Sequence, residues 1–274
     1  MVIPVGPNDV PILEQTLSYN KKNIIGYRNI YILTNPEWIQ DTSFLSEPTI
    51  TIIDERNLPI TIQTITEHLG ETKRVGWYLQ QLLKLYAGFF IPDILEYYLV
   101  VDADTAFLKP IPFFDGDLPL YNYGFEYHLP YFEHMKRLHP ALGRASQFSG
   151  ICHHMMFYKP LVRVLMFEIE KHHNQSFVEV FLSSVDKKEI EKSGASEYEI
   201  YFHFLLAFHR NKMRIRPLCW MNATKMEDKD GIEVLDYISC HYHLQGATPI
   251  VDISSLIFNK PQSTTPHTRM KLFR

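Results

Sequence analysis

The chain has 274 residues, of which 46% are hydrophobic and 14% aromatic, so it can bury a large core and does not have the composition of a disordered protein. Its formal net charge of −4 at pH 7 argues against a nucleic-acid partner, because such a partner requires a basic surface. No apolar stretch reaches the roughly 20 residues of a transmembrane segment, and the three scattered cysteines form no disulfide framework, which favours a cytoplasmic location.

The first part of the chain alternates β-rich and helical segments. Apolar and β-branched runs at residues 2–5, 29–33 and 49–54 predict strands, and residues 11–23 predict a helix. This order is typical of parallel strands joined by crossover helices. We therefore expect an α/β fold with a mostly parallel central sheet flanked by helices, in a single domain over residues 1–258 followed by a polar C-terminal tail at residues 259–274.

Residues 75–90 predict an amphipathic helix with two different faces. Its apolar residues recur at helical spacing and indicate a face that packs on the core. A second stripe could bind a ligand, because amide and ammonium groups can form hydrogen bonds with hydroxyls and phosphate oxygens. This stripe consists of Trp77, Gln80, Gln81 and Lys84. The alternative is a solvated helix face, although a large aromatic side chain such as Trp77 favours a cleft.

The most informative segment is the apolar run at residues 97–101, which predicts a buried parallel strand and leads directly into Asp102 and Asp104. Ligands of open α/β sheets bind beyond the carboxyl ends of the strands, and carboxylate oxygens suit Mg²⁺ or Mn²⁺ held against a diphosphate. An isolated D-x-D triplet is more often a pair of solvated loop acids. The apolar strand before this one and the FLKP segment at residues 107–110 after it favour a metal site.

The second half of the chain is less regular. Residues 110–147 are rich in Pro, Gly, Tyr and His and predict loops with short helices, which could contact a ligand. Residues 151–158 predict a strand, residues 161–172 and 197–209 predict helices, and residues 215–220 and 234–244 predict two final strands. Ser196 and Glu199 have the spacing of a capping box at the start of the second of these helices.

Two of these segments together resemble a known family. The sequence LVVDADTAFLKP at residues 99–110, preceded by GWYLQQLLKLYAG at residues 76–88, is similar to the donor site of GT-A glycosyltransferases that use a D-x-D motif. The resemblance implies a Rossmann-like GT-A domain that moves a sugar from a nucleotide-diphosphate sugar, UDP- or GDP-linked, to a hydroxyl of a glycan or another acceptor. It also implies that Asp102 and Asp104 hold Mn²⁺ or Mg²⁺ and that Asp104 takes part in catalysis.

Further positions match the same family through weaker motifs. Pro4 and Val5, at the end of the first strand, and Asp54, at the end of the third, correspond to positions that contact the nucleotide. Pro4 could instead be a turn residue, and Asp54 could be an ordinary acidic residue of a loop. The HLQG segment that begins at His243 resembles the H-x-x-G segment that supplies a third metal ligand, which favours His243 over His241. A buried structural histidine is the alternative.

The segment that begins at Ser149 resembles the entry to the sugar pocket of this family. Ser149 and Gly150 would line that pocket, where a residue without a side chain lets the donor approach. The adjacent residues His153 and His154 point to opposite faces of the predicted strand, and we assign His154 to the pocket. The alternative is a turn followed by one core and one surface histidine.

Glu197 is the candidate general base, because an inverting transferase needs a carboxylate to take the acceptor proton. It could also be an acid that is merely favourable in the first turn of its helix. A retaining enzyme needs no such base, and the sequence leaves the stereochemistry open.

Three other functions share some of these features. A sugar nucleotidyltransferase uses a similar sheet and metal but normally has a Gly-rich basic loop after its first strand, which the segment VIPVGPND at residues 2–9 lacks. A carbohydrate-binding protein without activity could keep the aromatic residues together with a vestigial acid pair. A zinc hydrolase is disfavoured, because the histidine-containing segments do not form a HExxH helix.

Overall fold

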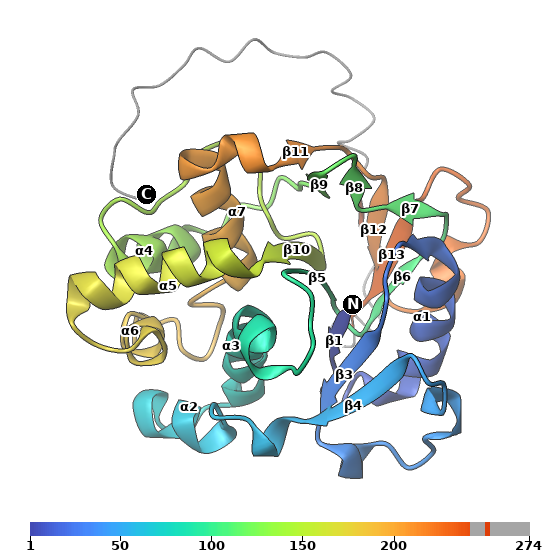
Figure 1. Ribbon diagram of the computed structural model, residues 1–274, viewed down its shortest axis with the longest axis horizontal. Coiled ribbons are helices and arrows are strands. Elements are labelled where there is room, and N and C mark those ends of the chain that lie inside the picture. The colour runs from blue at the N-terminus through green and yellow to red at the C-terminus, as the bar shows by residue number, and fades with distance from the viewer. Residues whose placement is uncertain (242–249, 253–274) are drawn as a thin grey trace.

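The computed structural model of the chain describes residues 1–241 and 250–252 (Figure 1). Within these residues the fold is α/β, as the sequence predicts, with seven α-helices and a central sheet of five strands. The strand order is β4-β3-β1-β5-β10. These strands are β1 (Val2–Pro4), β3 (Ile30–Thr34), β4 (Ile50–Asp54), β5 (Tyr97–Val101) and β10 (His154–Tyr158).

The central sheet is mostly parallel. Strand β1 pairs in parallel with both β3 and β5, and β3 pairs in parallel with β4, whereas β10 runs antiparallel to β5. Strands that are covered on both faces are rich in Val, Ile and Leu, and the four residues Tyr98–Val101 of β5 are all buried. The prediction of a mostly parallel sheet is therefore confirmed.

The seven helices of the described residues flank this sheet. In Figure 1, α1 lies to the right of β1 and β3, whereas α3 lies to their left together with α5 and α7. The first helices are α1 (Val10–Asn23), α2 (Ile62–Leu69) and α3 (Val75–Phe90). The later helices are α4 (Leu129–Leu138), α5 (Lys159–His173), α6 (Phe177–Ser183) and α7 (Glu197–Phe208).

Helix α3 packs unusually close to β5. A Cβ atom on Gly88 would lie 2.7 Å from a ring carbon of Tyr98, so only glycine fits at that position. The buried Tyr98 hydroxyl donates to the backbone oxygens of Lys84 and Leu85. This close contact fixes the height of α3 along β5 and brings Lys84 to the carboxyl end of that strand.

A second sheet continues from the acid pair. Its strand order is β14-β12-β13-β6, where β6 (Thr105–Phe107) begins directly after Asp104. The other strands are β12 (Trp220–Ala223), β13 (Tyr237–Cys240) and β14 (Ile250–Asp252). The sequence predicts a strand at residues 215–220, but the structure instead forms the short β11 (Arg214–Ile215) and starts β12 at Trp220.

Helix α1 holds β6 in place through two buried asparagines. The Asn20 side chain accepts a hydrogen bond from the Phe107 backbone N–H and donates to the Thr105 backbone oxygen. Asn23 donates to the Phe107 oxygen. Because β6 follows the acid pair at once, these bonds also fix the turn between β5 and β6.

The remaining strands form two small sheets beside the core. One has the order β11-β9-β8, with β9 (Leu118–Tyr121) and β8 (Phe114–Asp115). The other pairs β2 (Ile24–Ile25) with β7 (Ile111–Pro112). None of the helices in the described residues is long and apolar enough to cross a membrane.

The strand order creates one topological switch point. The chain leaves β1 towards β3 and β4 and then returns to β5 on the other side of β1. At such a point the loops that follow the two adjacent strands diverge and leave a crevice in which α/β proteins bind ligands. The residues after β1 and after β5 therefore meet at the same edge of the sheet.

Candidate functional site

A cavity of about 670 Å³ lies at this switch point. Its walls come from several elements that are far apart in the sequence. Asp9 follows β1, Asp102 and Asp104 follow β5, Lys84 lies on α3, Glu197 begins α7 and His241 follows β13. The volume falls in the range of about 300–1,000 Å³ that is usual for small-molecule sites.

A buried cation joins two of the predicted site residues. The Lys84 ammonium lies 2.7 Å from Oδ1 of Asp102 and 2.8 Å from Oε1 of Glu197, and it also lies over the ring of Tyr198. The Tyr198 hydroxyl donates to the same Asp102 oxygen at 2.7 Å. Lys84 and Glu197 are each 4% exposed, so this ion pair is almost completely shielded from solvent.

The charges of this cluster depend on one another. Burial alone would lower the pKa of Lys84, but the carboxylates of Asp102 and Glu197 outweigh it and leave the pKa raised. Burial raises the pKa of Asp102, and the nearby Lys84 and His153 more than reverse that effect, so the pKa is lowered. Glu197 keeps a raised pKa, because burial exceeds the opposing effect of Lys84. Lys84 therefore serves mainly to balance buried charge.

Asp104 is held by the second sheet. Its Oδ2 lies 2.8 Å from Nδ1 of His241, and its Oδ1 accepts a hydrogen bond from the Ser239 hydroxyl at 3.1 Å. The other ring nitrogen of His241 faces the side-chain oxygen of Asn222 at 2.9 Å. Burial raises the pKa of Asp104 and lowers that of His241, but their mutual contact reverses both effects. The result is an ionised carboxylate with a fixed orientation.

The structure places His153 at the cavity and His154 in the core, which is the reverse of the sequence-based assignment. His153 has a left-handed backbone with φ of 59° and lies 3.5 Å from Asp102 through Nδ1. Its ring also contacts that of His241. His154 begins β10 and points into a cluster of rings that includes Phe107 and Tyr237. Because His153 precedes β10 and has a left-handed backbone, the alternation of a strand does not set the direction of its side chain.

Ser149 and Gly150 do not line the described cavity. The Glu199 carboxylate accepts hydrogen bonds from the Ser149 hydroxyl at 2.8 Å and from the Gly150 N–H at 2.9 Å. A Cβ atom on Gly150 would lie 2.5 Å from the Cβ of Phe202 and 2.7 Å from the backbone oxygen of Tyr198. Glycine is thus required here for close packing of α7, and the space beside it is filled by protein.

The stripe on α3 divides between the cavity and the interior. Trp77, Gln80 and Lys84 line the cavity. Gln81 is 1% exposed, and its side-chain oxygen accepts a hydrogen bond from the Glu197 N–H at 3.1 Å. Gln81 therefore supports the first turn of α7 and does not line the cavity.

The three residues predicted to contact the nucleotide lie away from the cavity walls. Pro4 ends β1 and Val5 is 2% exposed, with its N–H donated to the Leu33 oxygen. Asp54 ends β4, two strands away from β1, and forms an ion pair with Arg56 at 2.9 Å. The chain that follows β1 reaches the cavity at Asp9, but the side chains of Pro4, Val5 and Asp54 do not line it.

His243 lies outside the described residues, so its predicted role as a metal ligand stays a prediction. His241, which the sequence motif ranked lower, contacts Asp104 directly. Its partner strand β13 ends at Cys240, whose N–H donates to the Asp104 backbone oxygen at 2.8 Å. His241 thus follows the second sheet beside the acid pair.

Three cavity carboxylates, Asp9, Glu126 and Glu191, were not identified from the sequence. Asp9 follows β1, and burial together with the charges of Asp104 and Asp102 raises its pKa to about 6. Glu126 is exposed at the cavity, where the surrounding protein and the charge of Glu199 raise its pKa. A signal for Asp9 was available, because an acid just after the first strand of an α/β sheet lies near the switch point. No pattern in the sequence marks Glu126.

The acid pair fits a divalent cation that arrives with a diphosphate. Asp102 and Asp104 supply hard oxygen ligands at the cavity, but within the described residues no group of three or more His, Cys, Asp or Glu side chains could hold a metal ion alone. Mg²⁺ is usually bound by one or two carboxylates together with substrate phosphates and waters. The donor set therefore matches such an ion and does not form a closed zinc site.

Comparison with known proteins gives a family but no activity. Residues 11–228 match the model of a family of unknown function, DUF6492, which is most of the chain. The chain belongs to the DUF6492 family. Lys84, the acid pair and Glu197 lie inside the part matched to DUF6492, whereas Asp9 and His241 lie just outside it. No curated protein matches the chain.

Proposed function

We propose that the chain is a metal-dependent glycosyltransferase of the GT-A type, which moves a sugar from a UDP- or GDP-linked donor to a hydroxyl of a glycan or another acceptor. One observation carries the proposal. The two carboxylates of the D-x-D triplet line a cavity of about 670 Å³ at the topological switch point of a mostly parallel sheet. The low cysteine content favours a cytoplasmic reaction.

The composition of the cavity supports a nucleotide-diphosphate donor. A divalent cation on Asp102 and Asp104 would neutralise the charge that develops on the leaving diphosphate. Trp77 and Tyr131 add aromatic surface to the same cavity, which suits the faces of a base or a sugar ring. The ordered partners of both acids would keep their carboxylates in position before the donor binds.

Lys84 has a different role in this proposal from the phosphate contact that the sequence suggests. Its ammonium already has two carboxylate partners, so its charge is largely balanced before a donor arrives. It keeps Asp102 ionised and oriented by a direct contact. Lys84 is thus a positioning residue, and the divalent cation carries the charge that faces the diphosphate.

Glu126 is better placed than Glu197 to take the acceptor proton in an inverting reaction. Glu197 is buried and bound to Lys84, so its carboxylate has little freedom to meet an acceptor. Glu126 lies exposed at the cavity with a raised pKa and, within the described residues, forms no ion pair. A raised pKa suits a general base at neutral pH. In a retaining reaction neither carboxylate is needed for this step.

Calorimetry with metal and nucleotide together tests the proposal. Because the protein offers few metal ligands of its own, Mn²⁺ alone should bind weakly, and UDP or GDP should bind at least tenfold more tightly when Mn²⁺ is present. Asp104→Asn should abolish this coupling, whereas the exposed Glu14→Gln should retain it. If a full nucleotide panel shows equal affinity with and without Mn²⁺, the proposal is wrong.

A further inference from the structure

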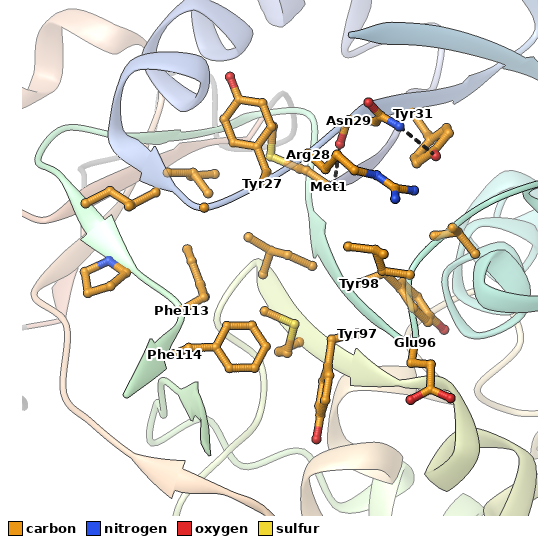
Figure 2. A pocket seen from close by; sticks show the side chains of 18 residues that line it. Met1, Tyr27, Arg28, Asn29, Tyr31, Glu96, Tyr97, Tyr98, Phe113 and Phe114 are labelled. Carbon is orange, nitrogen blue, oxygen red and sulfur yellow. Dashed lines mark hydrogen bonds between the residues drawn. The ribbon is translucent and has the colours of Figure 1, made fainter. Parts of the chain in front are cut away.

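A second cavity, of about 620 Å³, lies at the other end of the central sheet. Its lining includes Met1, which precedes β1, residues 97–99 of β5 and Met156 of β10. Figure 2 shows Tyr27 on one side and Phe113, Phe114 and Tyr97 on the other. It shares no lining residue with the cavity at Asp102, and the nearest lining positions along β5, Leu99 and Asp102, lie about 10 Å apart at about 3.3 Å per residue.

Several polar side chains around this second cavity are already hydrogen-bonded within the protein. The Tyr27 hydroxyl donates to the Lys21 oxygen, and the Arg28 guanidinium donates to the Asp93 oxygen. The Asn29 amide donates to the Tyr31 hydroxyl, as the dashed line in Figure 2 marks. Among the described residues, none of the buried side-chain N or O atoms that lack a partner belongs to this lining. A polar ligand would find few donors or acceptors to bond.

The aromatic rings of the lining are also engaged with one another. Tyr97 stacks on Tyr158 at 4.3 Å and meets the edge of Phe114 at 5.3 Å. Phe113 contacts the rings of Phe107 and His154, and the Arg216 guanidinium lies over it. A flat aromatic ligand would have to displace these contacts to stack. An aliphatic chain needs only close van der Waals contact, which the walls can provide as they stand.

The charges near the opening favour an uncharged chain as well. Arg28 and Glu96 are the charged side chains of the lining, one of each sign, and burial lowers the pKa of the Met1 amino group, which also lines the cavity, to about 5. Three exposed apolar side chains surround the opening, Ile25, Leu95 and Phe114, which are 54%, 50% and 38% exposed. An apolar cavity with an apolar opening fits the tail of a ligand whose polar head stays in solvent.

We infer that this cavity binds the aliphatic chain of a single-chain amphiphile, one molecule at a time. The inference does not depend on glycosyl transfer, because the two cavities lie at opposite ends of the sheet. It gives the protein a second ligand site with a chemical class quite different from that of a nucleotide.

Binding of 1-alkanols to the full chain tests this inference. From 1-hexanol to 1-decanol, calorimetric affinity should rise by up to about fourfold per methylene and then level off when the chain fills the cavity. Benzyl alcohol has as many carbons as 1-heptanol but should bind more weakly. In methyl spectra of labelled methionines, the Met156 signal should shift on binding, whereas that of Met135, buried on α4, should not.

A matched pair of variants separates this site from non-specific adsorption. Phe114→Ala removes one wall and should weaken 1-octanol binding about fivefold, whereas Phe167→Ala, 56% exposed on α5, should leave it unchanged. An unmoved Met156 signal, equal affinity for benzyl alcohol, or no binding would each overturn the inference. So would a dimer that Phe114→Ala dissociates, because the cavity would then belong to a contact with a second copy.

Discussion

Replacing Lys84 by Met tests whether the buried cation balances the charge of the site. The substitution keeps an unbranched side chain but leaves Asp102 and Glu197 without their shared partner, with side-chain exposures of only 19% and 5%. Removing one member of a buried ion pair typically costs about 3–5 kcal/mol. For 274 residues, an unfolding entropy of about 2.1 cal/mol/K per residue converts this loss to a fall in Tm of about 5–9 °C.

The assay is thermal and urea unfolding of Lys84→Met beside a control, Lys22→Met, whose exposed lysine on α1 should change stability by less than about 0.5 kcal/mol. Adding Glu197→Gln to Lys84→Met should restore part of the loss, because it removes one of the two uncompensated charges. If Lys84→Met unfolds at the same urea concentration and temperature as the unchanged protein, the charge-balancing role assigned to Lys84 is refuted.

Three further outcomes are expected. In EDTA, Asp9→Asn should gain in Tm relative to the unchanged protein as pH rises from about 4 to 6 and hold that gain above pH 6. The pKa of Asp9 is raised to about 6 in the folded state, so between these pH values the carboxyl ionises in the unfolded chain first, which disfavours the folded state. A Tm difference that is constant with pH would contradict this. If transfer inverts, Glu126→Gln should lower turnover by roughly 10²–10⁴-fold with unchanged donor affinity, whereas Glu197→Gln should mainly lower stability; the opposite pattern would return the base to Glu197. Gly150→Ala should cost about 1–3 kcal/mol in urea unfolding, because its Cβ would lie 2.5 Å from another side chain; unchanged stability would show that α7 can shift to make room.

Local patterns were enough to predict the fold class. The apolar run of β5 and its end at Asp102 are visible in the sequence because a parallel strand covered on both faces consists of consecutive apolar residues. The helical spacing of residues 75–90 likewise marks the full length of α3. The short strands β8 and β11, of two residues each, carry too little pattern to be recognised.

The site was harder to predict because its contacts join distant segments. Helical spacing shows that Lys84 shares a stripe with Trp77, but it cannot show that Glu197 of α7, 113 residues later, packs against the ammonium. The sequence predicts a strand through His153 and His154, but it does not show that the strand begins at His154 or that His153, with its left-handed backbone, meets Asp102. Side-chain facing is a local property, whereas the partner on each face depends on the tertiary fold.

The most direct test of the proposed function is donor hydrolysis in the absence of an acceptor. The full chain is incubated with Mn²⁺ and a panel of UDP- and GDP-linked sugars, and release of the nucleoside diphosphate is measured beside Asp104→Asn. We predict slow, Mn²⁺-dependent release from at least one donor, lost in Asp104→Asn, because the carboxylate that His241 orients at the cavity would hold the metal on the diphosphate. Release that persists in Asp104→Asn, or that is absent for every donor although the nucleotides bind, would contradict the assignment of this site to glycosyl transfer.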